Sequence, residues 1–151
     1  MARAQLLIRM GTIAFVLSFL TSTSASEQAE RSITKSVWDG VYSADQGQRG
    51  KEQYQKSGCA ACHGSNLEGQ GMAAVLNGET FMNSWNGRTV QDRFLRIQAT
   101  MPPDDPCSLT SAACRDIVAF LLQSNKFPPG QTDLGPDAAA LKAIALSREK
   151  P

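Results

Sequence analysis

Residues 59–64 read CAACHG, so two cysteines are separated by two residues and followed at once by the chain's single histidine. A C-x-x-C pair of this kind can contribute to a zinc site, can perform thiol–disulfide exchange on its own sulfurs, or can attach haem covalently. Each of these uses requires something different from the remainder of the chain. The rest of the sequence therefore decides among them.

The first 26 residues have the features of a signal peptide. Arg3 and Arg9 form a basic N-terminal region, residues 10–20 are largely apolar, and TSTSAS supplies small residues for signal peptidase, with cleavage expected after Ala25 or Ser26. An uncleaved membrane anchor is the alternative, but a span needs about 20 apolar residues and Arg9 shortens this run. The sequence predicts a protein exported to the periplasm, with no membrane span in the mature chain.

The charge of the mature chain is nearly balanced. The full chain has 15 Lys and Arg against 14 Asp and Glu, and cleavage removes two arginines and no acid, so 13 basic residues remain and the net charge becomes about −1. Such a balance offers no field for nucleic acid, and no basic cluster lies on a predicted helix. The mature length of roughly 125 residues fits one domain.

The sequence predicts a first helix over about 43–56. SADQ at its start matches a capping box, with Gln46 as the third helical residue, and Gly58 follows its end. Gly50 and Tyr54 share one face of this helix, where a glycine allows another backbone to approach closely. A helix at this position therefore has a packing partner.

Two further helices are predicted downstream. TVQD opens a helix that begins at Thr89 and stops at Met101, and in it Val90, Phe94 and Ile97 form an apolar stripe at helical spacing. Pro102 stops it, because the residue before a proline is pushed out of the helical region. The next apolar stripe predicts a third helix over about 110–125.

The remaining segments carry weaker patterns. Residues 65–88 are rich in glycine and lack periodicity, which predicts a loop, and residues 138–146 form one amphipathic segment, which predicts a short surface helix. No segment alternates as a strand would. The sequence therefore predicts an all-α domain at 37–127, preceded by a flexible segment at 27–36 and followed by a tail at 128–151.

The other cysteines argue against zinc. Cys107 and Cys114 are separated by six residues, Cys114 falls on a predicted helix face, and an exported setting oxidises thiols. A thioredoxin-like site is also disfavoured, because it places C-x-x-C after a strand in a βαβ pattern that this chain lacks. Haem attachment satisfies all these conditions. In C-x-x-C-H the thiols of Cys59 and Cys62 add to the haem vinyl groups, and His63 becomes the proximal iron ligand.

The sixth iron ligand has three candidates in the mature chain. A second histidine is absent, so methionine is the next common partner, and Met72, Met82 and Met101 are available. Met72 and Met82 follow His63 closely, on the stretch that first wraps one side of the haem. Met101 lies just beyond a helix, where Pro102 holds the chain extended, so it is the favoured ligand for the opposite face. An open sixth position is the remaining alternative.

Several motifs together resemble those of class I c-type cytochromes. They are CAACHG, GMAAVLNG, the MPPDDP loop and the closing DIVAFLL helix. VWDGVY and WNGRT resemble in particular the monohaem cytochromes and cytochrome domains associated with pyrroloquinoline-quinone (PQQ) alcohol dehydrogenases. The resemblance covers roughly residues 37–127 and implies a small cytochrome c fold of three to five helices around one covalent haem c. It also implies that Gly50 and Tyr54 cross Phe120 of the last helix.

The resemblance implies further roles in the haem pocket. Leu76 would press on the haem, and Trp85 and Arg88 would lie near its propionates. Ala74 stands where the family usually has a proline whose carbonyl accepts the proton on Nδ1 of the proximal histidine. A carbonyl survives this replacement, so the bond from His63 remains available.

Cys107 and Cys114 depart from the commoner pattern of that family, which has no cysteine at these positions. If Thr110 caps the third helix, Cys114 lies in its first turn and Cys107 in the loop that folds back on it, so a disulfide between them is predicted. This bond would brace the segment that follows Met101.

Two functions from different classes follow from these assignments. The first is an electron carrier or electron-transfer subunit, reduced by a dehydrogenase, which the resemblance suggests is a quinoprotein, and oxidised by an oxidase or another cytochrome. The second is a haem enzyme or gas sensor with a labile sixth ligand. That function would require a distal acid or base, usually a histidine, and His63 is already used.

Overall fold

The computed structural model describes residues 33–106 and 108–151. The predicted signal peptide, most of segment 27–36 and Cys107 lie outside the described residues. Within the described part, the elements are β1 (Lys35–Ser36), the 3₁₀ helix η1 (Val37–Asp39), α2 (Ala44–Lys56), α3 (Cys59–His63), α4 (Gly78–Trp85), α5 (Val90–Thr100), α6 (Ser111–Ser124), α7 (Ala138–Lys142) and β2 (Ile144–Ala145). The predicted all-α class is confirmed, with one two-residue strand pair added.

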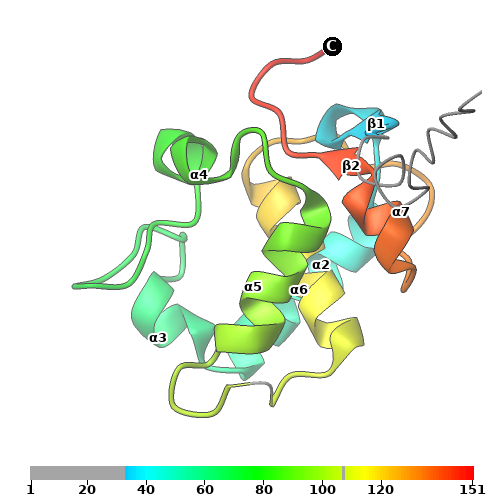
Figure 1. Ribbon diagram of the computed structural model, residues 1–151. Coiled ribbons are helices and arrows are strands. Elements are labelled where there is room, and N and C mark those ends of the chain that lie inside the picture. The colour runs from blue at the N-terminus through cyan, green and yellow to red at the C-terminus, as the bar shows by residue number, and fades with distance from the viewer. Residues whose placement is uncertain (1–32, 107) are drawn as a thin grey trace, which may run out of the picture. The chain divides into compact units, whose positions relative to one another are not determined.

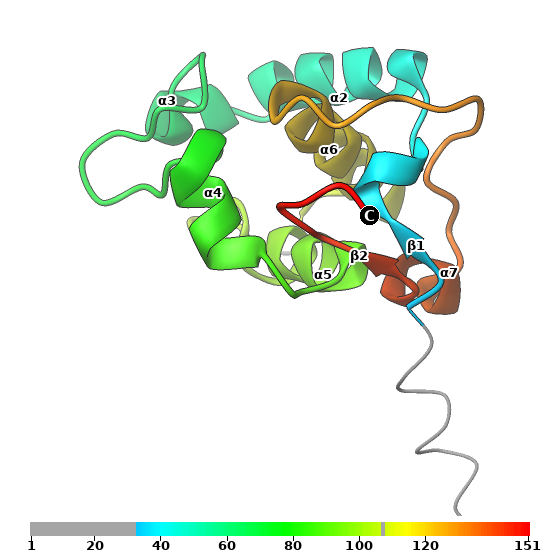
Figure 2. The same ribbon diagram turned by 90° about the horizontal axis from the view of Figure 1, so that it is seen from above.

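Two groups of elements lie on opposite sides of the central helices α5 and α6. Figures 1 and 2 both show α3 and α4 on one side of α5 and α6, with α7 and the strand pair on the other. Among the described residues, no helix is long and apolar enough to cross a membrane.

Helices α2 and α6 cross closely at Gly50. A Cβ at this position would lie 1.8 Å from the main-chain oxygen of Asp116, so only glycine allows the approach. One turn further along α2, the ring of Tyr54 packs against Phe120 of α6 with a centroid distance of 5.3 Å. The predicted crossing of Gly50 and Tyr54 with Phe120 is therefore observed, and it fixes the helix that leads into CAACHG.

The start of α2 differs from the predicted capping box. The Ser43 side chain accepts from the main-chain N–H of Gln46 as expected. The Gln46 side chain, however, is buried and turns to Leu134, donating to its carbonyl at 3.3 Å and accepting from its N–H at 2.7 Å. The box is half formed, because the tail offers Gln46 two main-chain partners that the helix end does not.

The loop prediction for residues 65–88 is wrong in its second half, where α4 lies. Only Phe81 and Met82 of this helix are buried, and its N-cap residue makes no side-chain capping bond, so neither a long stripe nor a start signal marks it in the sequence. Arg148 from the tail donates to the side chains of Glu79 and Asn83 on the outer face of α4. Tertiary contacts therefore support a helix that its own sequence marks weakly.

The tail packs closely on the helices. Helix α7 ends at Lys142, earlier than predicted, and the chain continues as β2, which pairs in parallel with β1 so that Lys35 lies opposite Ile144. Leu146 is buried and exchanges two main-chain hydrogen bonds with the turn after α4, donating to the Arg88 carbonyl at 2.8 Å and accepting from Gly87 N–H at 2.9 Å. Residues 128–151 thus belong to the same compact unit as the helices.

Candidate functional site

Helix α3 carries both cysteines and the histidine of CAACHG. It begins directly after Gly58, whose φ of 74° turns the chain out of α2, and it spans five residues. Cys62 and His63 lie three and four residues after Cys59, so the three side chains share one face of the helix. The short helix therefore presents the whole motif in one direction.

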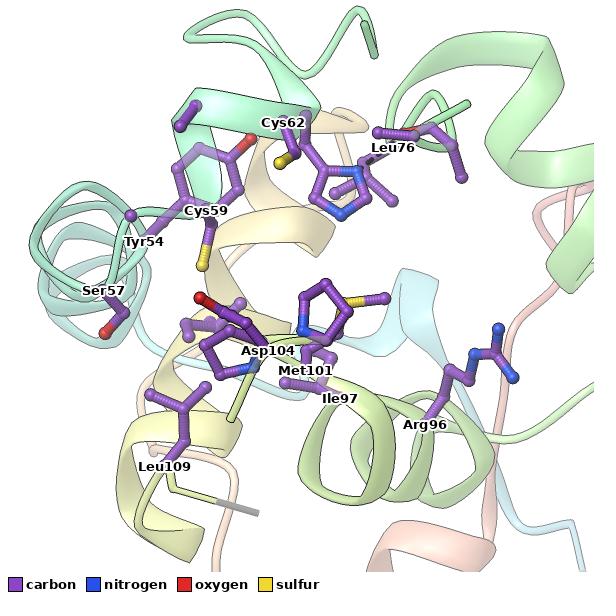
Figure 3. Close-up of a pocket in the computed structure, with 18 of the residues that line it drawn as sticks. Tyr54, Ser57, Cys59, Cys62, Leu76, Arg96, Ile97, Met101, Asp104 and Leu109 are labelled. Atoms are coloured by element: carbon purple, nitrogen blue, oxygen red, sulfur yellow. Dashed lines mark hydrogen bonds between the residues drawn. The ribbon is translucent and has the colours of Figure 1, made fainter. Parts of the chain in front are cut away.

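A cavity of about 830 Å³ lies in front of this face. This volume is toward the upper end of the range for small-molecule and cofactor sites, roughly 300–1,000 Å³. Figure 3 shows Cys59 and Cys62 on one side of the space and Met101 and Ile97 on the other. Apolar side chains from α5 and α6 complete the wall, among them Ile97, Ile117 and Leu121.

His63 is oriented by a main-chain acceptor. Its Nδ1 lies 2.8 Å from the carbonyl oxygen of Ala74. Because a carbonyl only accepts, Nδ1 carries the proton and Nε2 is left with its lone pair for a metal. The hydrogen bond from His63 to the Ala74 carbonyl, which we expected from the sequence to remain available, is therefore present.

A side chain of α2 forms a hydrogen bond with the turn that follows His63. The hydroxyl of Tyr54 donates to the carbonyl of Gly64 at 2.7 Å, and the N–H of Gly69 donates to the carbonyl of His63 at 2.8 Å. Burial raises the pKa of Tyr54 well above its usual value, so the hydroxyl remains a donor at every physiological pH. Tyr54 thus connects the α2–α6 crossing to the residue beside the histidine.

Replacing Tyr54 with phenylalanine is expected to lower the free energy of unfolding by about 1–2 kcal/mol, because the buried Gly64 carbonyl loses its donor. Tyr42→Phe is the matched control, since the Tyr42 hydroxyl donates to the buried Phe127 carbonyl at 2.7 Å but does not touch the His63 turn. Denaturant unfolding should show similar losses for both variants, whereas only Tyr54→Phe should alter the haem spectrum. Identical spectra would contradict a positioning role for Tyr54.

The three candidate methionines occupy different surroundings. Met101 is half-buried at the end of α5, in extended backbone with φ −128° and ψ 142°, and lines the cavity opposite α3. Met72 borders the cavity but its side chain is fully exposed. Met82 is buried in α4 and belongs to the apolar core. Met101 is therefore the methionine best placed to face His63 across the cavity.

The other predicted pocket residues divide into two groups. Leu76 is buried and lines the cavity, in agreement with contact to a bound group. Trp85 and Arg88 are not among the lining residues: Trp85 is half-buried on α4, and the exposed Arg88 places its guanidinium 5.6 Å from the Trp85 ring. Their predicted proximity to the propionates stays a prediction.

Arg93 is a cavity residue that the sequence reasoning missed. It is 7% exposed, lines the cavity, and holds its guanidinium 4.7 Å from the Trp85 ring centre and 5.7 Å from that of Phe81. Burial, reinforced by the nearby Arg96, lowers its pKa to about 10. The available signal was its position, since Arg93 falls on the buried stripe between Val90 and Ile97.

The donor set fits haem better than the other two uses of C-x-x-C. Among the described residues, no group of three or more Cys, His, Asp or Glu side chains gathers to hold a metal ion, which disfavours zinc. Burial raises the pKa of the Cys59 thiol, whereas dithiol redox sites depend on lowered thiol pKa values. Haem instead fills an apolar cavity, takes two thiols as thioethers, and uses the imidazole Nε2. The site defines a c-type cytochrome domain.

Comparisons with known proteins agree with this class. The family model described as "Cytochrome C oxidase, cbb3-type, subunit III" matches residues 45–121, just over half of the chain. The chain belongs to this family, and its cofactor is haem c, for which Cys59, Cys62 and His63 form a fitting C-x-x-C-H motif. No curated protein matches the chain.

One solved structure is similar, described as "Crystal Structure of the Sulfane Dehydrogenase SoxCD from Paracoccus pantotrophus". It has 20% sequence identity and a TM-score of 0.47, over 86% of this chain and 68% of the other.

The predicted disulfide stays a prediction. Cys114 is fully buried in the first turns of α6, as expected, but Cys107 lies outside the described residues.

Proposed function

We propose that this protein is an exported, periplasmic electron carrier or electron-transfer subunit whose haem iron is ligated by His63 and Met101. A cytochrome c domain is an electron-transfer haem protein, and haem c supplies an iron that alternates between ferric and ferrous states. Beyond this class of protein, we propose the two axial iron ligands, the periplasmic compartment and the redox partners. One observation carries it: Met101 lies across one apolar cavity from Cys59 and Cys62 of helix α3, and His63 of the same helix also lines this cavity.

The protein's own groups support the carrier role over an enzyme. With Nδ1 bonded to the Ala74 carbonyl and Nε2 taken up by the haem iron, His63 would have no nitrogen left to act as an acid or base toward a substrate. The facing wall near Met101 includes the apolar side chains of Ile97, Pro102 and Leu109, with Asp104 and Asp105 beside them. It holds no histidine, the usual distal acid or base of a haem enzyme, because the chain's single histidine lies on α3. With ligands on both sides the iron keeps no open position, and only electrons are exchanged.

The proposed partners are redox proteins. The resemblance of VWDGVY and WNGRT to cytochromes associated with PQQ alcohol dehydrogenases suggests a quinoprotein donor, with an oxidase or another cytochrome as acceptor. A direct assay would mix the purified holoprotein with dehydrogenases recovered from periplasmic extract and follow haem reduction. If none reduces the haem faster than a generic chemical donor, the quinoprotein assignment is lost and the carrier role stands.

Replacing Met101 with alanine is expected to open the sixth position. The wild-type ferric protein should show a low-spin spectrum with methionine ligation, and its ferrous form should not bind carbon monoxide. Met101→Ala should bind carbon monoxide rapidly, because a side chain that faces His63 has been removed.

Met72→Ala is the matched control for this experiment, since Met72 borders the same cavity with its side chain in solvent. It should retain the wild-type spectrum. Rapid carbon monoxide binding by the wild-type protein would overturn the carrier proposal and support a haem enzyme or gas sensor.

A further inference from the structure

Arg93 carries a buried charge whose partner is missing from the protein. Its Nε is buried and has no hydrogen-bond partner, and within the described residues no acidic side chain pairs with its guanidinium. With a pKa of about 10 the side chain is positively charged at neutral pH. A buried charge without a partner is strongly unfavourable, so such a group usually faces an ion of opposite charge.

The surrounding residues stabilise the cation only in part. The rings of Trp85 and Phe81 offer cation–π contacts, which stabilise the cation by less than the cost of burying an unpaired charge. Arg96 and Arg88 add charge of the same sign nearby, Arg96 on the next turn of α5 and Arg88 on the Trp85 ring. These neighbours therefore attract an anion to the guanidinium of Arg93 but do not supply one.

The cavity that Arg93 lines belongs to a cofactor with two carboxylates. Haem carries two propionates at one edge, and a guanidinium binds a carboxylate through paired N–H groups. Arg96 lines the same cavity, so two cations of α5 border it. Arg88 is exposed and does not line the cavity, although it lies at the WNGRT motif.

We propose that Arg93, held against Trp85 and Phe81, is the ion-pair partner of a haem propionate and thereby keeps the reduction potential insensitive to pH near neutrality. This inference rests on the attached haem and not on the electron-carrier proposal. Arg93 acts on the iron through the propionate, so it is a positioning residue.

The sign of the effect follows from charge. Reduction adds an electron to the iron, so an ionised propionate disfavours reduction and a nearby cation favours it. An opposite charge in contact lowers a carboxyl pKa by about 1–3 units. Burial in an apolar cavity raises a carboxyl pKa because it disfavours the charged form, and Arg93 offsets this effect. Without Arg93 the effect of burial remains, so the propionate pKa rises above its usual value of about 4.3 toward the neutral range. Between the propionate pKa of the ferric protein and the higher pKa of the ferrous protein, each electron taken up is then accompanied by a proton that passes from solvent to the propionate oxygen.

Other charged groups border the same region and set the background. Arg96 comes from α5, Arg88 follows α4, and Asp104 and Asp105 line the cavity from the loop after Met101. On the neighbouring elements, the imidazole of His63 is bonded to Ala74, Glu79 of α4 is paired with Arg148, and Asp92 of α5 is bonded to Thr89. These groups are unchanged in the variants tested below.

The test is the midpoint potential of the holoprotein between pH 5 and pH 9 for wild type, Arg93→Gln and Arg115→Gln. The wild type and Arg115→Gln should give flat profiles near neutrality. Arg93→Gln should give a lower potential at high pH and an inflection displaced upward by about 1–3 pH units. Arg115→Gln is the matched control because it removes the same charge from α6 at a residue that does not line the cavity. An Arg93→Gln profile parallel to that of the wild type would overturn the proposal.

A second measurement needs no variant and covers the case in which Arg93→Gln does not mature. The haem-methyl proton resonances of the wild-type protein should show no propionate titration above about pH 5, because the ion pair offsets the effect of burial and keeps the propionate pKa at or below the usual carboxyl value of about 4.3. A propionate titration above about pH 6 would contradict the ion pair. Carbon monoxide binding by the wild type, in contrast, would remove the carrier proposal and leave this result interpretable.

Discussion

Replacing both Cys59 and Cys62 with alanine is expected to abolish covalent haem attachment and, with it, stable folding. The two thiols are the thioether donors of the motif, and the cavity that they border has a volume of about 830 Å³. Without its occupant, apolar walls from α5 and α6 would face water or an unfilled space, each costly for a small domain.

Mass spectrometry of the mature double variant, produced in a host that attaches haem c, should give the mass of the polypeptide alone. Circular dichroism should show a loss of the cooperative unfolding transition seen for the holoprotein. Ala61→Ser, within the same motif, is the control and should retain the added mass, because both thiols and His63 are unchanged. Covalent haem in the double variant would show that attachment does not use these thiols.

Replacing Gly50 with alanine is expected to destabilise the holoprotein by about 3 kcal/mol or more. The new Cβ would lie 1.8 Å from the Asp116 carbonyl oxygen and 2.8 Å from Cβ of Phe120, so α2 and α6 would have to separate. The gain in helix propensity, up to about 1 kcal/mol, is too small to offset this clash. Because α2 leads directly into α3, the separation would also disturb the His63 turn.

Thermal unfolding should show a decrease in Tm of roughly 10 °C or more for Gly50→Ala. Gly47→Ala is a graded control on the same helix, since the three atoms nearest to its Cβ would all belong to the Gln123 side chain, which can move aside. Gly135→Ala has no atom within 4 Å and should leave Tm nearly unchanged. Equal Tm values for Gly50→Ala and Gly47→Ala would show that the α2–α6 distance is not critical.

The sequence predicted the parts of the structure that local chemistry specifies. CAACHG indicated haem because thiol spacing and the adjacent imidazole are fixed by the cofactor, and the helices around Tyr54 and Ile97 were marked by caps and apolar stripes. Position 101 was singled out by the proline that follows it, and Met101 does lie across the cavity from α3.

The parts that could not be predicted depend on contacts distant in sequence. Helix α4 is supported by Arg148, which lies far along the chain, and Gln46 leaves its own helix end for Leu134. Arg93 was overlooked because a charged residue on an apolar stripe is ordinarily taken to extend to solvent. Its burial becomes visible only when α4 places Trp85 and Phe81 beside it.

The contact between His63 and Ala74 has a consequence for how this site can change over evolutionary time. The acceptor is an oxygen of the main chain, so the bond is indifferent to the side chain at position 74, which is exposed. What must persist is the path of the segment, and the N–H of Leu76 bonded to the Leu67 carbonyl at 2.8 Å secures it. Selection on this part of the protein would therefore act on the shape of the loop and accept at position 74 any residue, alanine or proline among them, that keeps this path.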